Sequence, residues 1–127
     1  MKLRIRGNSI RVRLERNEVA RLGRGERIEQ VTEFSPDSHL VSRVESSPVS
    51  HVAATFYAGC MTLLLPAEMV KAWAASDDVS IEAVQKISED RELSILVEKD
   101  FECLHSQKEE NADAFPNPRG CPADHAA

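Results

Sequence analysis

The sequence predicts a small, mainly β protein of the α+β class: an antiparallel β-barrel made of two ββαββ repeats related by a pseudo-twofold axis, with two short helices. Three observations predict it. Apolar and polar residues alternate over several short segments, and in each half the first two such segments are followed by a short segment with helical spacing of its apolar residues. The whole order of segments repeats at an offset of 51 positions. At 127 residues, the chain has the size of one domain. We expect residues 1–105 to form this domain, with repeats at 1–50 and 51–100, and residues 106–127 to form a polar, irregular and partly disordered tail.

Residues 2–14 show the pattern of a β-hairpin. Apolar and basic residues alternate strictly over residues 2–6, and apolar and polar residues alternate again over residues 9–14. A period of two is typical of a strand that is buried on one face. The two segments are joined by Gly7-Asn8, which suits a two-residue turn. The sequence therefore predicts two antiparallel strands with a basic outer face.

A short helix and two further strands complete the first half. Val19 and Leu22 are three positions apart, and two glycines follow where a helix of about two turns would end. Residues 28–34 are then predicted to form a strand, and residues 40–44 a weaker one.

The second half repeats this pattern at an offset of 51 positions. The matched pairs are Ile10 with Met61, Val12 with Leu63, Leu14 with Leu65, Val19 with Val70, Leu22 with Trp73 and Ile28 with Val79. Pro66 stands at the start of the second helix, where its missing N–H is no loss. Two alternating segments follow, around Ile81 and around Ile95. We interpret the pattern as a duplication with both halves packed about a pseudo-twofold axis, the alternative being a chance match between two hairpin-and-helix segments.

Two short motifs flank the first predicted helix. Residues 7–14 have the sequence Gly-Asn-Ser-Ile-Arg-Val-Arg-Leu, and residues 25–28 have the sequence Gly-Glu-Arg-Ile. They resemble the swapped-hairpin unit of AbrB-type and MazE-type transcription factors, whose Ile-Pro helix entry has its counterpart in Leu-Pro-Ala-Glu at residues 65–68. Such units normally come from two chains. The resemblance therefore implies a fused dimer in one chain, or a related double-psi or cradle-loop barrel.

Two later segments extend the comparison to the whole chain. Residues 98–104 have the sequence Glu-Lys-Asp-Phe-Glu-Cys-Leu, and residues 113–118 have the sequence Asp-Ala-Phe-Pro-Asn-Pro. Together with the basic Gly-Asn-Ser hairpin, they resemble a family of small bacterial proteins of unknown function. This resemblance implies no activity.

Charge is distributed unevenly along the chain. Residues 1–27 carry nine Lys or Arg against three Glu, whereas the rest carries seven basic and eighteen acidic residues, for a net charge of −5. A basic N-terminal part therefore faces an acidic remainder.

Arg4, Arg6, Arg11 and Arg13 form the candidate anion-binding surface of the first hairpin. A two-residue turn places Arg4 opposite Arg11 and Lys2 opposite Arg13. Like charges that face each other destabilise a sheet by on the order of 0.2–1 kcal/mol per pair. Either carboxylates of the chain compensate these charges, or a bound anion does. The candidate carboxylates are Glu29, Glu33, Glu92 and Glu98.

The anion alternative predicts a function. Arginine binds phosphate groups bidentately, so the arginine surface suits nucleic acid or a phosphorylated small molecule. We therefore expect a non-enzymatic binding module. The matching positions of the second half, Thr55, Tyr57, Thr62 and Leu64, are uncharged. A symmetric grip on duplex DNA would accordingly need two whole chains, and the protein is expected to be a monomer or a homodimer.

Four residues near the end of the chain provide the alternative prediction. Cys103, His105, Cys121 and His125 offer two sulfurs and two imidazoles, the ligand set of a tetrahedral zinc site. The alternative function is thus a metal-binding or small-molecule-binding barrel, with its site near Cys103 and His105 or between the repeats, and this alternative includes an enzyme. A third alternative is a structural or interaction protein. Without zinc, Cys103 is expected to be a small buried apolar residue. Phe115 is expected to hold the tail against the barrel by burying its ring.

Other functional classes find little support in the sequence. It contains no nucleophile elbow, HExxH motif, Walker loop or GxGxxG motif, so no catalytic residue and no cofactor besides the alternative zinc is predicted. No apolar run approaches the roughly 18 residues that a membrane-spanning helix needs. The three cysteines, an odd number, fit a reducing compartment. We therefore expect a cytoplasmic protein that does not contact membranes.

Overall fold

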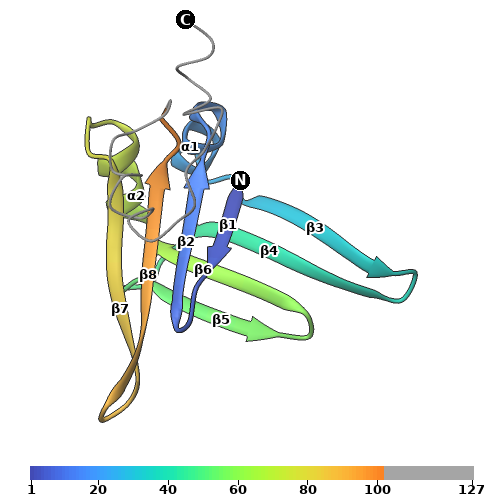
Figure 1. The fold of residues 1–127 in the computed structure, drawn as a ribbon. Helices are drawn as coiled ribbons and strands as arrows, with labels where there is room; N and C mark the ends of the chain where they lie inside the picture. The colour runs from blue at the N-terminus through green and yellow to red at the C-terminus, as the bar shows by residue number, and fades with distance from the viewer. Residues whose placement is uncertain (102–127) are drawn as a thin grey trace, which may run out of the picture.

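The computed structural model describes residues 1–101, which form two sheets joined by two helices at one end (Figure 1). The elements are β1 (Lys2–Ile5), β2 (Ser9–Leu14), α1 (Arg16–Gly23), β3 (Ile28–Ser35), β4 (Ser38–Ser47), β5 (Ala53–Tyr57), β6 (Cys60–Pro66), α2 (Ala67–Ala74), β7 (Ser80–Ser88) and β8 (Arg91–Lys99). One sheet has the strand order β1-β2-β8-β7, and the other has the order β3-β4-β6-β5. Each sheet therefore combines one hairpin from each half of the chain.

The central pair of strands in each sheet is parallel. β2 pairs with β8 and β4 pairs with β6 in parallel, whereas the outer pairs are antiparallel. The prediction of purely antiparallel pairing is therefore wrong. β2 and β8 meet in parallel because both run toward the end of the molecule that carries the helices (Figure 1). Nor is the predicted closed barrel found, since the strands of residues 1–101 form two separate sheets.

An apolar core lies between the sheets and against the helices. The side chains that are 0% exposed are Val12, Leu14, Leu22, Val44, Leu63, Leu65 and Val97. They come from both sheets and from α1, and they belong to one continuous cluster of buried residues. Burying a side chain of this size stabilises the fold by about 1.5–3 kcal/mol. The predicted alternation of β2 is confirmed, since every second residue of this strand is buried.

The first hairpin of each half has the same register. Leu3 lies opposite Val12 in the β1–β2 pair, and Ala54 lies opposite Leu63 in the β5–β6 pair, 51 positions later. The two helices have eight residues each and also begin 51 positions apart. The first hairpins and the helices therefore correspond at the predicted offset.

The predicted match of Ile28 with Val79 is wrong. Ile28 lies opposite Val44 in the β3–β4 pair, whereas Ile81 lies opposite Val97 in the β7–β8 pair. Val79 precedes β7 and is 45% exposed, while Ile81 is 6% exposed. Because the segment between the helix and this strand position is two residues longer in the second half, the offset rises from 51 to 53.

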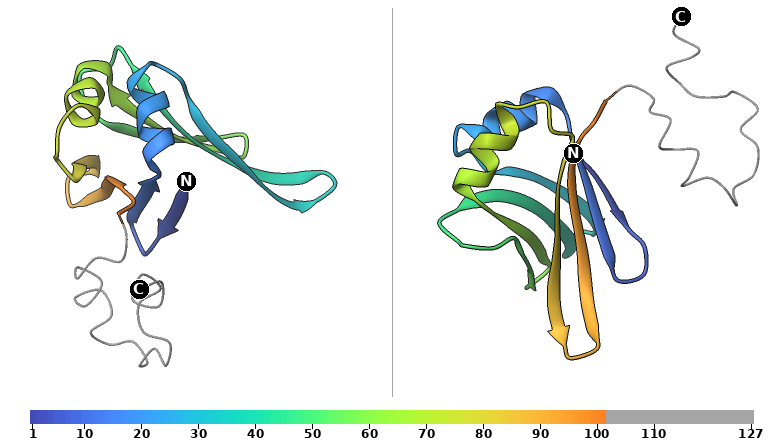
Figure 2. Two further views of the ribbon diagram at one scale, coloured as in Figure 1. Left: turned by 90° about the horizontal axis from the view of Figure 1, so that it is seen from above. Right: turned by 90° about the vertical axis from the view of Figure 1, so that its left-hand side faces the viewer.

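The helices α1 and α2 lie side by side, and the two sheets diverge from them (Figure 2). At the contact, a Cβ atom added to Gly23 would lie 3.1 Å from the Cβ atom of Ala74. These two residues occupy matching positions, the last of each helix. Val70 and Trp73, the counterparts of Val19 and Leu22, are buried at 1% and 3% exposure, whereas Met69, for which the helical pattern also predicts a core position, is 41% exposed. Small residues at the ends of the helices thus permit a close approach.

Gln85 of β7 joins the two sheets. Its Nε2 donates a hydrogen bond to the carbonyl of Ala54 at 3.0 Å, and the N–H of Ala54 donates to its Oε1 at 2.7 Å. Ala54 lies in the edge strand β5, where backbone groups on one side have no neighbouring strand. The side-chain amide of Gln85 therefore takes the place of a strand neighbour.

Candidate anion-binding face

The basic residues predicted for the first hairpin lie on the surface of the sheet that is turned away from the core. In β2 the buried residues alternate with Arg11 and Arg13, which are half-buried. Arg4 lies opposite Arg11 and Lys2 lies opposite Arg13, so the predicted register is confirmed. We call the surface formed by Lys2, Arg4, Arg6, Arg11 and Arg13 the basic face.

The turn of the hairpin is anchored to the neighbouring strand. Gly7 has a φ of 55°, a conformation that glycine adopts readily. The N–H of Arg6 donates to the carbonyl of Ser9 at 3.0 Å and closes the turn. The side chain of Asn8 donates to the carbonyl of Glu92 in β8 at 2.6 Å. The tip that carries Arg6 is therefore held at a fixed position in the sheet.

Glu98 of β8 joins two arginines of the basic face. The Nε atoms of Arg11 and Arg13 donate to the same oxygen, Oε1 of Glu98, at 2.7 and 2.6 Å. The side chain of Glu98 is 9% exposed, and those of Arg11 and Arg13 are 17% and 20% exposed. Hydrogen bonds between ionised groups in such partly buried surroundings are stronger than neutral ones. Glu98 therefore fixes the orientation of both guanidinium groups.

The carboxylates beside the basic face offset part of its charge. Glu98 is shared between two arginines, and Asp100 pairs with Lys2 at 2.9 Å. Glu98 and Asp100 therefore compensate part of the charge of the basic face from within the same sheet and its immediate continuation.

Two adjoining hollows lie on the basic face. One, of about 150 Å³, is lined by Arg4, Arg6, Ser9 and Arg11. The other, of about 120 Å³, is lined by Lys2, Leu3, Arg4, Arg11 and Arg13. The rung formed by Arg4 and Arg11 belongs to both hollows, and all four predicted arginines line at least one. The structure thus brings the predicted residues together.

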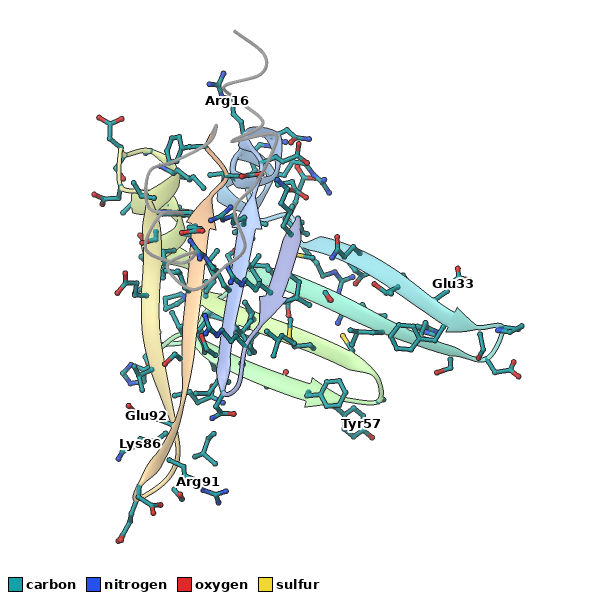
Figure 3. All side chains as sticks on the ribbon, viewed as in Figure 1. Arg16, Glu33, Tyr57, Lys86, Arg91 and Glu92 are labelled. Atoms are coloured by element: carbon teal, nitrogen blue, oxygen red, sulfur yellow. The ribbon has the colours of Figure 1, made fainter. Side chains whose placement is uncertain are left out.

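The predicted carboxylate partners are distributed over both sheets. Glu98 accompanies the basic face as predicted. For Glu29 the prediction is wrong, because its Oε2 accepts a hydrogen bond from Nε of Arg43 in the other sheet at 2.7 Å, which raises the pKa of Arg43. Glu33 lies near the far end of β3, and Glu92 lies toward the tip of the β7–β8 hairpin (Figure 3). One of the four candidates therefore takes the predicted role.

The sequence-based set of site residues omits Lys2. This residue alternates with Leu3 and lies opposite Arg13, so the same pattern that selects the arginines also selects it. In the second half, Thr55 lies opposite Thr62 at the positions that match Arg4 and Arg11. The matching surface of the β5–β6 hairpin therefore lacks these cations.

The predicted zinc ligands lie outside the described residues. Cys103, His105, Cys121 and His125 all follow residue 101, as does the predicted tail at residues 106–127. Within residues 1–101, no group of three or more His, Cys, Asp or Glu is placed to hold a metal ion. No helix in this same range is long and apolar enough to cross a membrane.

Comparison with known protein families assigns the chain to a family. Residues 1–119 match a family of unknown function, DUF7009. The chain belongs to this family. No curated protein and no solved structure matches it, and the resemblance to AbrB-type and MazE-type factors is not shown. The DUF7009 match extends 18 residues beyond the described part of the chain, so the family shares more than the two sheets and helices.

Proposed function

We propose that the chain is a non-enzymatic binding module whose basic face takes the phosphate groups of a nucleic acid or another polyanion. The observation that carries the proposal is the row of cations along the hairpin, in which Arg11 and Arg13 are oriented by one shared carboxylate. An arrangement whose donors are fixed before the ligand arrives loses less conformational freedom on binding.

The spacing of the cations favours a ligand with several anionic groups. Successive rungs of the hairpin are two residues apart, which corresponds to about 6.6–6.8 Å along a strand. The rung of Arg4 and Arg11 lies between the two hollows, so a chain of phosphates placed along the hairpin can contact both. A polyanion therefore makes more contacts than one isolated phosphate.

We also propose that the two halves of the chain are duplicated modules of which one has kept the charge. The equal registers of β1–β2 and β5–β6 at an offset of 51 support this, as does the contact between Gly23 and Ala74 at matching helix ends. Each sheet combines hairpins of both halves, an arrangement expected for a fused pair of swapped-hairpin units. A symmetric grip on duplex DNA would then use two chains.

Salt-dependent binding tests the proposed function. Fluorescence anisotropy with labelled single-stranded and duplex oligonucleotides should show binding at low salt that weakens steeply as salt rises, because condensed counterions are released. Replacing Arg6→Gln or Arg11→Gln should each reduce the slope of log K against log salt by about 1.

Arg43→Gln is the matched control, because it removes one arginine that also donates to a carboxylate, but from the other sheet. It should leave both affinity and slope unchanged. Absence of binding at low salt would refute the proposal, as would an Arg43→Gln variant that loses as much affinity as Arg11→Gln.

A further inference from the structure

β3 is an edge strand, and its distal part is exposed. It pairs with β4 on one side, and within residues 1–101 no strand lies on its other side. Residues 31–35 of β3 are all exposed, and among them Val31 and Phe34 are 54% and 70% exposed. An unpaired strand edge with exposed apolar side chains readily pairs with a further strand. The β3 edge is therefore a candidate site for another chain.

The hairpin of β3 and β4 projects beyond the rest of its sheet (Figure 1). β6 pairs with residues 41–47 of β4, so the described chain places no third strand beside residues 38–40 or their partners in β3. A hairpin of two strands is only marginally stable in water, and a third strand adds stability where the strands share an apolar face. A strand added along β3 would therefore stabilise the projecting part of the hairpin.

β1, the edge strand of the other sheet, directs backbone groups away from its neighbour. The N–H of Arg6 donates to the carbonyl of Ser9, and antiparallel pairs alternate, so the backbone groups of Arg4 also point toward β2. Those of Leu3 and Ile5 therefore point to the opposite side, where residues 1–101 contribute no strand. Ile5 is also 59% exposed, so this edge too presents an apolar side chain.

We propose that the β3 edge pairs with the β1 edge of a second copy of this chain. β3 carries Glu29 and Glu33, and the strand period of two places both on one face. Lys2 and Arg4 lie on one face of β1 with the same period. Glu29 also accepts a hydrogen bond from Arg43, so Glu33 is the main acid for the contact. Pairing that continues the sheet brings opposite charges together, and such pairs stabilise neighbouring strands.

Charge selects β1 over the other strand edges. β3 has no Lys or Arg, so two β3 edges would bring glutamates against each other, and directly opposed like charges destabilise a sheet. β7 carries both signs, as Glu82 and Lys86, and its Gln85 already contacts the β5 edge. The contact is head-to-tail, so it either closes into a ring or extends along a row of chains. It goes beyond the proposed anion binding and needs no ligand.

Sedimentation velocity of the full chain, without nucleic acid, tests the contact. The unmodified chain should associate as its concentration rises. Glu33→Lys should weaken the association by about tenfold, because an attractive pair becomes a repulsive one. Glu89→Lys makes the same charge change in the turn between β7 and β8 and should leave the association unchanged. A chain that stays monomeric at every concentration would overturn the proposal, as would equal weakening by the two variants.

Two variants, each blocked at one edge, identify β1 as the partner. Ile5→Pro removes an N–H that points away from β2, so it should weaken association while the thermal midpoint stays unchanged. Mixed with Glu33→Lys, it leaves one intact edge of each kind, and the mixture should form a 1:1 dimer at concentrations where each variant alone is monomeric. A mixture that stays monomeric overturns the proposal. Undiminished association of Ile5→Pro also overturns it and would assign the β3 edge to a second β3 edge.

Discussion

At Glu98, one carboxylate oxygen accepts hydrogen bonds from two guanidinium groups. The pair of bonds, at 2.7 and 2.6 Å, is mostly shielded from water, since none of the three side chains exceeds 20% exposure. Such a carboxylate lowers the repulsion between the cations of the basic face. Glu98 therefore stabilises the sheet and also reduces the attraction of the basic face for anions.

Glu98→Gln should separate these two effects. The free energy of unfolding should fall by about 1–3 kcal/mol, because two charged donors lose an ionised partner. The amide oxygen of glutamine can still accept from both Nε–H groups and keep them oriented, so affinity for an oligonucleotide should rise, because the basic face loses a negative charge. Urea denaturation and fluorescence anisotropy measure the two quantities. Glu29→Gln, which alters the more exposed pair with Arg43, should lower stability less and leave binding unchanged; unchanged stability or weaker binding for Glu98→Gln would contradict the account.

Residue-scale prediction succeeded where a local rule applied. Strict alternation and a two-residue turn determine that Arg4 faces Arg11, because both rules involve neighbours within one hairpin. The choice of Glu98 as the shared carboxylate depends on a contact between residues 85 and 87 positions apart. No local pattern specifies that β8 lies beside β2, so four carboxylates remained equivalent in the sequence.

At the scale of elements, the two helices depend on small residues at their contact. Gly23 approaches Ala74 so closely that an added Cβ atom would lie 3.1 Å from that of Ala74. Side chains larger than a methyl group at this point force the helices apart or force rotamers out of their minima. The close approach of α1 and α2 at this point therefore depends on small residues at both matching positions.

Gly23→Val should lower the free energy of unfolding by about 1–3 kcal/mol, as overpacked contacts do. Intrinsic helix propensity favours valine over glycine. A lower free energy of unfolding therefore results from the contact of residue 23 with Ala74 and not from a weaker helix. Adding Ala74→Gly should restore part of the stability, since it opens space opposite the new side chain. Chemical denaturation of the two variants measures this, and a double variant no more stable than Gly23→Val alone would contradict it.

The elements themselves were predictable to different degrees. Residues 28–34 and 40–44 were expected as strands, and β3 and β4 are longer, with β4 spanning Ser38–Ser47. β4 pairs on both sides, with β3 and with β6, so neighbouring strands support residues whose own pattern is weak. The two-residue difference after α2 escaped prediction because Val79 and Ile81 alternate equally well.

At the scale of the whole molecule, the fold depends on the pairing of one hairpin from each half within each sheet. Alternation predicts that a segment is a strand, but it does not specify which strand lies beside it. The sequence pattern therefore does not predict the parallel pairing of β2 with β8 and of β4 with β6. Nor does it predict that the strands form two sheets. The contact of Gln85 with Ala54 shows how a side chain can connect two sheets that share no ladder.

The same arrangement provides an internal comparison for the function. The outer surface of β1–β2 is basic, and the matching surface of β5–β6 carries Thr55 and Thr62 in the places of Arg4 and Arg11. Both hairpins have the same register and a parallel neighbour on one side. Differences in anion binding between the paired strands of the two hairpins therefore report side-chain charge and not strand register.

An NMR titration of the ¹⁵N-labelled chain with a short oligonucleotide at low salt makes that comparison in one sample. We expect shifts of the backbone amides and the arginine Nε–H groups over residues 2–13, with none over residues 53–64. Shifts that centre on residues 53–64, or no shifts at all, would contradict the proposed function.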